Sequence, residues 1–156
     1  MQTKRTFLYT ILAGAITLAL VAGPMLWATP AFAQTGSGEL TVEEAGALQF
    51  MREEEKLARD VYLTLDEQWN LRVFQNISRS EQIHMDEVKT LLDKYGIDDP
   101  TVGNGIGVFA NSELQELYDK LISSGSTSLS DALRVGVSIE EIDILDLQAR
   151  LATIDK

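Results

Sequence analysis

Polar residues interrupt two helical stripes of apolar side chains in this chain, and they limit the folds that it can adopt. Steps of three and four residues through the first segment meet Leu48, Met51, Glu55, Ala58, Tyr62, Leu65 and Trp69. The same steps through the second segment meet Phe74, Ile77, Glu81, His84, Val88, Leu91 and Tyr95. This spacing predicts two helices that each bury one face. A carboxylate on a buried face needs a cationic partner, because its desolvation is costly.

Capping and breaking residues set the ends of these two helices. Thr41 and Glu44 form a capping-box pattern before the first stripe. Only Asn70 and Leu71 separate the two stripes, which predicts a tight antiparallel hairpin. Gly96 is expected to end the second helix in a left-handed conformation.

The rest of the chain predicts a loop and two further helices. Residues 101–110 contain three glycines and are expected to form a surface loop. One helix should start at Asn111 or the next residue, and another should run from Ser128 to about Leu151, with Gly136 able to break it. No segment alternates apolar and polar residues with a period of two, so the predicted fold class is all-α.

Residues 1–33 have the pattern of a secretory signal peptide. Lys4 and Arg5 precede an apolar run, and the segment ends in Ala31-Phe32-Ala33, a small-x-small cleavage pattern. An uncleaved membrane anchor is the alternative interpretation. We expect cleavage, a short linker over residues 34–40, one domain over residues 41–156, and a secreted or periplasmic location without membrane attachment.

Charge and cysteine content narrow the classes of partner. Removal of residues 1–33 takes away two basic residues and no acid, which changes the formal net charge from −11 to −13. Nucleic acid and anionic lipid are therefore excluded as expected partners, whereas metal cations are favoured. The chain has no cysteine, so it has no disulfide, thiolate ligand or thiol nucleophile.

The interrupting residues are predicted to converge. Glu81 and His84 are three residues apart and share one helix face. Counted from the turn, Glu55 lies 15 residues back and His84 lies 13 residues forward. With about 1.5 Å of rise per residue, the two side chains lie within roughly 3 Å of one level. Oxygen and nitrogen donors without sulfur suit iron, manganese or zinc.

The motifs around these residues resemble known proteins. Glu55-x-x-Ala58-Arg59-x-x-Tyr62 is similar to the first metal-binding helix of rubrerythrin-type proteins in the ferritin-like superfamily. Residues 51–62, 76–85 and 133–147 together resemble an uncharacterised ferritin-like family, domain of unknown function 2202. The resemblance implies an antiparallel helical bundle with an iron site, and a di-iron centre in complete members.

By this resemblance the last helix supplies a further ligand. Its stripe contains Val137, Glu140, Ile144 and Leu147, so Glu140 is assigned to the metal site. Glu141 is assigned to a capping box with Ser138. Members of the family usually continue into another helix with an Asn-His pair, whereas this chain stops at Lys156 and has His84 as its only histidine. We therefore expect an incomplete bundle that lacks the last metal-site helix. Either a single ion binds, or a dimer supplies the missing ligand, or the site is damaged.

A purely structural interpretation of the interrupted stripes also exists. Glu55, Glu81 and His84 could form a buried salt-bridge cluster, with His84 protonated or with Arg59 as the cation. Tyr62 could lie beside the metal or be an ordinary core residue. The remaining acids near the stripes are expected on solvated faces: Glu53, Glu54, Asp86 and Glu87.

Two functions follow as hypotheses. The first is an exported ferritin-like protein that binds iron or another transition metal through Glu55, Glu81, His84 and Glu140, with ferroxidase or peroxide- or oxygen-reducing activity in intact relatives. The second is a non-enzymatic envelope protein with a vestigial site, which acts by protein–protein association. A second copy of the chain or a partner helix would then complete the bundle.

Overall fold

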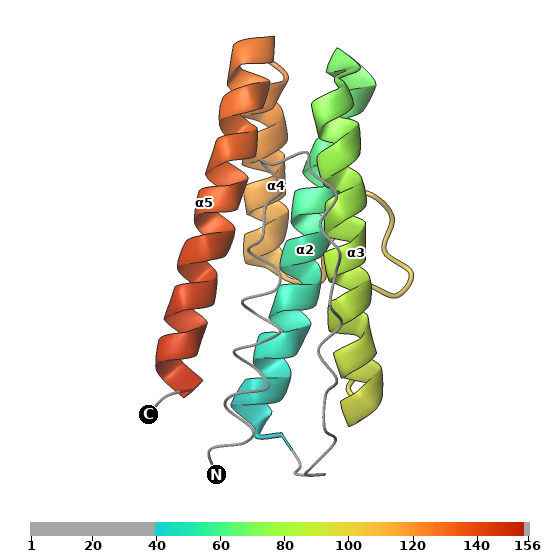
Figure 1. The fold of residues 1–156 in the computed structure, drawn as a ribbon, viewed down its shortest axis with the longest axis vertical. Helices are drawn as coiled ribbons and strands as arrows, with labels where there is room; N and C mark the ends of the chain where they lie inside the picture. Colours follow the sequence, from blue (N-terminus) through green and yellow to red (C-terminus); the bar gives the residue numbers. More distant parts are fainter. Residues whose placement is uncertain (1–39, 155–156) are drawn as a thin grey trace, which may run out of the picture.

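The computed structural model describes residues 40–154, which form four α-helices and no β-strand (Figure 1). The helices are α2 (Val42–Trp69), α3 (Arg72–Tyr95), α4 (Ser112–Gly125) and α5 (Leu129–Ile154). Successive helices run in opposite directions, and α2 packs against each of the other three. The all-α prediction is confirmed. None of these helices is long and apolar enough to cross a membrane. The predicted signal peptide lies outside the described residues.

The hairpin of α2 and α3 forms as its capping residues predict. Glu44 N donates to Thr41 Oγ1 over 3.1 Å, and Thr41 N donates to Glu44 Oε2 over 2.8 Å. Asn70 ends α2 with a φ of 50°, and Gly96 ends α3 with a φ of 65°. The two-residue turn fixes the register between the helices.

The main apolar core lies between α2, α4 and α5. Its buried residues include Val61 and Leu65 of α2, Leu114 of α4 and Val135 of α5. Gly136 does not break α5, which is continuous to Ile154. A Cβ atom at Gly136 would lie 3.3 Å from the Tyr62 ring, so the glycine allows this ring to lie against α5.

The buried face of α5 differs from the predicted one. Val137 is 60% exposed and Ile144 is also exposed, whereas Ala132, Val135 and Ile139 are buried. The predicted stripe therefore faces outward at Val137 and Ile144, whereas Glu140 between them is half-buried. The reason is that α5 packs against α2 and α4, and this selects a face one residue away from the apolar pattern.

The loop between α3 and α4 lies against α2 and buries charged residues there. Gly105 O accepts from Lys56 Nζ over 2.7 Å, and Gly107 N donates to an Asp60 oxygen over 2.9 Å. Glu53 accepts from the backbone N–H groups of Ala110 and Asn111, so the prediction of a solvated Glu53 is wrong. Four of the buried charged residues of α2 lie on this side, and we call them the charged face of α2: Arg52, Glu53, Lys56 and Asp60.

Candidate metal centre

Glu55 of α2 meets Glu81 and His84 of α3 inside the hairpin. Nδ1 of His84 lies 3.0 Å from Glu81 Oε2 and 3.3 Å from Glu55 Oε2. One ligand atom from each residue lies within 4.8 Å of the other two. Both carboxylates are 5% exposed. We call these three residues the Glu/His cluster, and the structure brings them together at the place that the register predicts.

The hairpin itself holds the Glu/His cluster in position. Leu48 of α2 packs with Leu91 and Leu92 of α3 on one side of it along the helix axes. Phe74 and Tyr62 pack on the other side, with their ring centroids 5.9 Å apart. Apolar packing therefore fixes both helices, and the three polar side chains face each other between the two contacts.

Burial and hydrogen bonds shift the protonation equilibria of the cluster. The hydrogen bond to Glu55, followed by that to Glu81, raises the pKa of His84 to about 10. Burial raises the pKa of Glu55 to about 7, although the hydrogen bond with His84 acts in the opposite direction. His84 therefore carries a proton at neutral pH, and this single cation faces two buried carboxyl groups.

Asp143 of α5 is a further acid near the cluster that the sequence analysis missed. Burial, followed by the charge of Glu81, raises its pKa to about 6. The negative charge of Asp143 in turn raises the pKa of Glu55. Asp143 lies three residues after Glu140, the same spacing as between Glu81 and His84, and this repeated spacing was the available signal.

Glu140 lies at the edge of the site and is held by Tyr62. It does not belong to the group of ligand atoms within 4.8 Å, and its side chain is half-buried. The Tyr62 hydroxyl lies 2.9 Å from Glu140 Oε1 and 3.1 Å from Gly136 O. Burial raises the pKa of Glu140.

The predicted capping box after Gly136 is wrong. The hydroxyl of Ser138 donates to Arg134 O within a continuous helix, and Glu141 is exposed. A cap requires a helix start, and α5 begins earlier, where Ser128 Oγ accepts from Asp131 N over 3.1 Å.

Arg59 does not neutralise the cluster. Its guanidinium donates to Asp60 over 2.7 Å and to Gln82 Oε1 over 2.7 Å. His84 is therefore the only cationic group that pairs with Glu55 and Glu81 among the described ion pairs. Two buried carboxylates and one imidazole form an oxygen and nitrogen donor set that fits a divalent transition metal, which would replace the proton on His84.

Comparison with known proteins gives the family of the chain. Residues 44–156, which include all four candidate ligands, match the family described as an uncharacterized protein domain, DUF2202. The chain belongs to the DUF2202 family.

One relative of the chain is Uncharacterized protein MJ0754 of Methanocaldococcus jannaschii. It is 56% identical over 109 residues, which cover 70% of this chain and 59% of the relative. The crystal structure of hypothetical protein MJ0754 from Methanococcus jannaschii DSM 2661 matches with a TM-score of 0.72 at 52% identity. That match covers 76% of this chain and 67% of the other. The chain thus spans 59% of the length of its relative in sequence.

Proposed function

We propose that this DUF2202 protein is an exported ferritin-like protein that binds a transition metal, with iron as the expected ion. The observation that carries the proposal is the charge imbalance of the Glu/His cluster. Two carboxyl groups that are 5% exposed share one imidazole. Burial of such a group is costly unless a cation compensates it, and a divalent ion does so better than one proton.

The side chains have distinct roles in this proposal. Glu81 and His84 would hold the ion together, because an oxygen of Glu81 lies 3.0 Å from Nδ1 of His84. Glu55 and Glu140 are the flanking carboxylates. Tyr62 positions Glu140 through its hydroxyl, and this contact also ties α5 to α2. Binding of a cation releases the proton of His84, whose pKa is about 10 in the metal-free protein.

In the proposed chemistry, ferrous iron is oxidised while dioxygen or peroxide is reduced. Ferrous iron, when bound, supplies one electron to dioxygen or to peroxide. The carboxylates stabilise the higher charge of the ferric state, and burial keeps bulk water away from the ligands. A ferritin-like bundle is the fold that this ligand pattern supports.

Metal loading tests the proposal. The purified protein is incubated with Fe(II) without oxygen, passed through a desalting column and analysed for bound iron. We expect bound iron in the natural protein and none above background in the double variant Glu81→Ala and His84→Ala. The matched control is Asp86→Ala with Glu87→Ala, on the exposed side of the same helix. Equal binding by the natural protein and the Glu81 and His84 variant would refute the assignment.

We further propose export through residues 1–33, on the basis of their charged start, apolar run and Ala-x-Ala end. The mass of the protein purified from the envelope or medium of a producing cell tests this. A mature chain that begins at Gln34 is expected.

The exposed apolar stripe of α5 supports a second candidate function, association with another copy of the chain. We define this outer stripe by four exposed residues at helical spacing: Leu129, Leu133, Val137 and Ile144. Exposed apolar residues repeated along one side of a helix favour a protein contact. Light scattering should give a dimer mass for the natural protein and a monomer mass for Val137→Glu. A monomer in both cases would exclude this candidate.

A further inference from the structure

The loop between α3 and α4 contains the sequence Asn104-Gly105, which is suited to a reaction of the chain with itself. In such a pair, the backbone nitrogen of the second residue attacks the side-chain Cγ of the asparagine and closes a succinimide ring. Glycine favours this attack, because it has no side chain that shields the nitrogen and its backbone rotates freely. The other three asparagines of the chain precede leucine, isoleucine and serine. Asn104 is therefore the candidate site.

The attacking nitrogen is unobstructed in the folded protein. Gly105 is exposed, and its N–H donates to no acceptor among the described residues. A Cβ atom at Gly105 would have no atom within 4 Å, so there is open space for a ring. The N–H of Ile77, which follows Asn76, instead lies within α3, where such groups form helical hydrogen bonds. The fold thus leaves the Gly105 nitrogen accessible to a base.

The side chain of Asn104 also leaves its Cγ open to attack. Its Nδ2 donates to Pro100 O over 3.1 Å, and its Oδ1 accepts no hydrogen bond from the part of the chain that the structure describes. Pro100 O can therefore hold the nitrogen that has to leave. The side chain of Asn111, by contrast, caps α4 through its Oδ1, which accepts from two backbone N–H groups. The two asparagines next to this loop and in it thus differ in their freedom.

We propose that Asn104 is a site of spontaneous deamidation. The Gly105 nitrogen gives up its proton and forms a bond to Cγ of Asn104. The bond between Cγ and Nδ2 breaks, and this nitrogen leaves as ammonia with that proton. Water then opens the ring. Opening at Cγ gives an aspartyl residue at position 104, and opening at the backbone carbonyl gives an isoaspartyl residue. Water is the one reactant that the chain does not supply.

The isoaspartyl product would disturb the contact of the loop with the charged face of α2. Gly105 O accepts from Lys56 Nζ over 2.7 Å, and the same Nζ lies 4.5 Å from the ring centroid of Phe109 in this loop. Lys56 is 1% exposed. An isoaspartyl residue lengthens the backbone by one carbon just before Gly105 and adds a negative charge. Loss of a partner is costly for a buried ammonium, so we expect a less stable protein.

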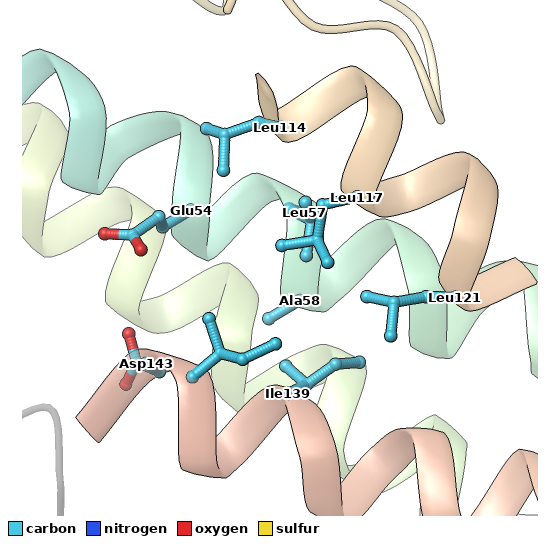
Figure 2. Close-up of a pocket in the computed structure, with 9 residues that line it drawn as sticks. Glu54, Leu57, Ala58, Leu114, Leu117, Leu121, Ile139 and Asp143 are labelled. Atoms are coloured by element: carbon cyan, nitrogen blue, oxygen red, sulfur yellow. The ribbon is translucent and has the colours of Figure 1, made fainter. Parts of the chain in front are cut away.

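Helix α4 fixes the far end of the loop, so the extra atom has to be absorbed within the loop. Figure 2 shows Leu114, Leu117 and Leu121 of α4 around a small pocket between α2, α4 and α5. Glu54 and Asp143 line the same pocket, and the predicted solvation of Glu54 is incomplete, since this side chain is half-buried. Apolar packing thus holds α4 in place while the loop changes.

Ageing of the purified full chain tests the proposal. The protein is kept in mildly alkaline buffer, which favours loss of the Gly105 proton, and is then digested with trypsin. One peptide, residues 95–120, contains both Asn104 and Asn111. Fragment masses locate the deamidation, and an isoaspartyl methyltransferase measures the isoaspartate. We expect conversion at Asn104 to exceed that at Asn111 by at least about tenfold. No conversion above an unaged sample, or equal conversion at the two positions, would overturn the proposal.

Two glycine variants test the route. Gly105→Ala fits the open space without a clash, and its methyl group should slow conversion of Asn104 by about tenfold. Gly46→Ala, at an exposed position of α2 that is equally open, is the matched control and should leave the rate unchanged. Equal rates in both variants would refute attack by the Gly105 nitrogen.

Urea denaturation tests the consequence for the loop. The midpoint should fall to a lower urea concentration as the natural protein ages, and Asn104→Gln, whose longer side chain closes the ring poorly, should keep its midpoint. An unchanged midpoint in fully converted protein would refute the predicted loss of the Lys56 contact.

Discussion

Helix α2 buries charged side chains on two of its sides, the charged face of α2 and its part of the Glu/His cluster. The two sides differ in how their charges are neutralised. On the charged face of α2, each side chain has an opposite charge or a backbone partner: Lys56 pairs with Asp60, and Arg52 pairs with Asp99 over 3.1 Å. In the Glu/His cluster, one imidazole serves two carboxyl groups. The acids of α5 add negative charge nearby.

The difference separates charges that stabilise the fold from charges that are suited to bind a ligand. Partners within the chain satisfy the charged face of α2, so it has no need of an ion. The Glu/His cluster is compensated only while His84 is protonated. Hydrogen bonds to Glu55 and then Glu81 raise the pKa of His84, and burial raises the pKa of Glu55. Removal of one carboxylate should therefore lower the free energy of unfolding on the charged face of α2 and raise it in the Glu/His cluster.

The largest change in the free energy of unfolding is expected on the charged face of α2. Asp60 and Lys56 are both almost completely buried, so Asp60→Asn leaves an uncompensated ammonium in the core. We expect the free energy of unfolding to fall by about 3–5 kcal/mol. Urea denaturation measures this change. A loss below about 1 kcal/mol would mean that the pair behaves like a surface ion pair.

In the metal-free protein, the pH dependence of stability should show the contribution of the protonated His84. Its folded pKa is about 10 against an ordinary value of 6.5. The stabilisation is therefore fully present below about pH 6.5 and is lost as the pH rises toward 10. Between these values it falls by at most about 1.4 kcal/mol per pH unit, and by less than this because solvent screens the partly exposed imidazole.

Denaturation at several pH values measures this slope. His84→Gln should remove this part of the slope, and excess Zn(II) should also abolish it above about pH 6.5, since the metal-bound imidazole carries no proton in the folded protein. Identical slopes in the natural protein and in His84→Gln would contradict the assignment.

Tyr62→Phe should lower both the stability of the fold and the affinity of the site for metal. Loss of the hydroxyl that contacts Glu140 and Gly136 O should cost about 1 kcal/mol of stability. Metal affinity should fall by about tenfold, as for other residues that orient a ligand. Titration with Zn(II) measures the affinity. Tyr118→Phe removes a hydroxyl that bonds Thr64 instead, and should leave the affinity unchanged.

The smallest change is expected at Glu55, with a reversed sign. Because burial raises the pKa of Glu55 to about 7, Glu55→Gln removes an unfavourable charge at pH 9. The metal-free protein should gain about 1 kcal/mol in the free energy of unfolding. Glu67→Gln, at an exposed position of the same helix, is the control and should change little. A large loss in the free energy of unfolding for Glu55→Gln would mean that Glu55 stabilises the fold, as the residues of the charged face of α2 do.

Local patterns predicted the hairpin and the Glu/His cluster, because both depend on short-range geometry. A two-residue turn and a rise of about 1.5 Å per residue determine which residues of α2 and α3 lie at one level. The same reasoning failed for α5, where Val137 is exposed and Asp143 faces the pocket and the cluster. No short turn connects α5 to α2, so periodicity alone cannot fix its rotation.

The sequence by itself determined the four helices, their caps and the meeting of Glu55 with Glu81 and His84. Hydrogen bonding along the chain and the period of 3.6 residues are sufficient for these features. Only the tertiary structure decided the rotation of α5, the contact between Tyr62 and Glu140, and the burial of Glu53 beneath the loop before α4. These depend on contacts between distant segments, and packing rather than local preference selects them.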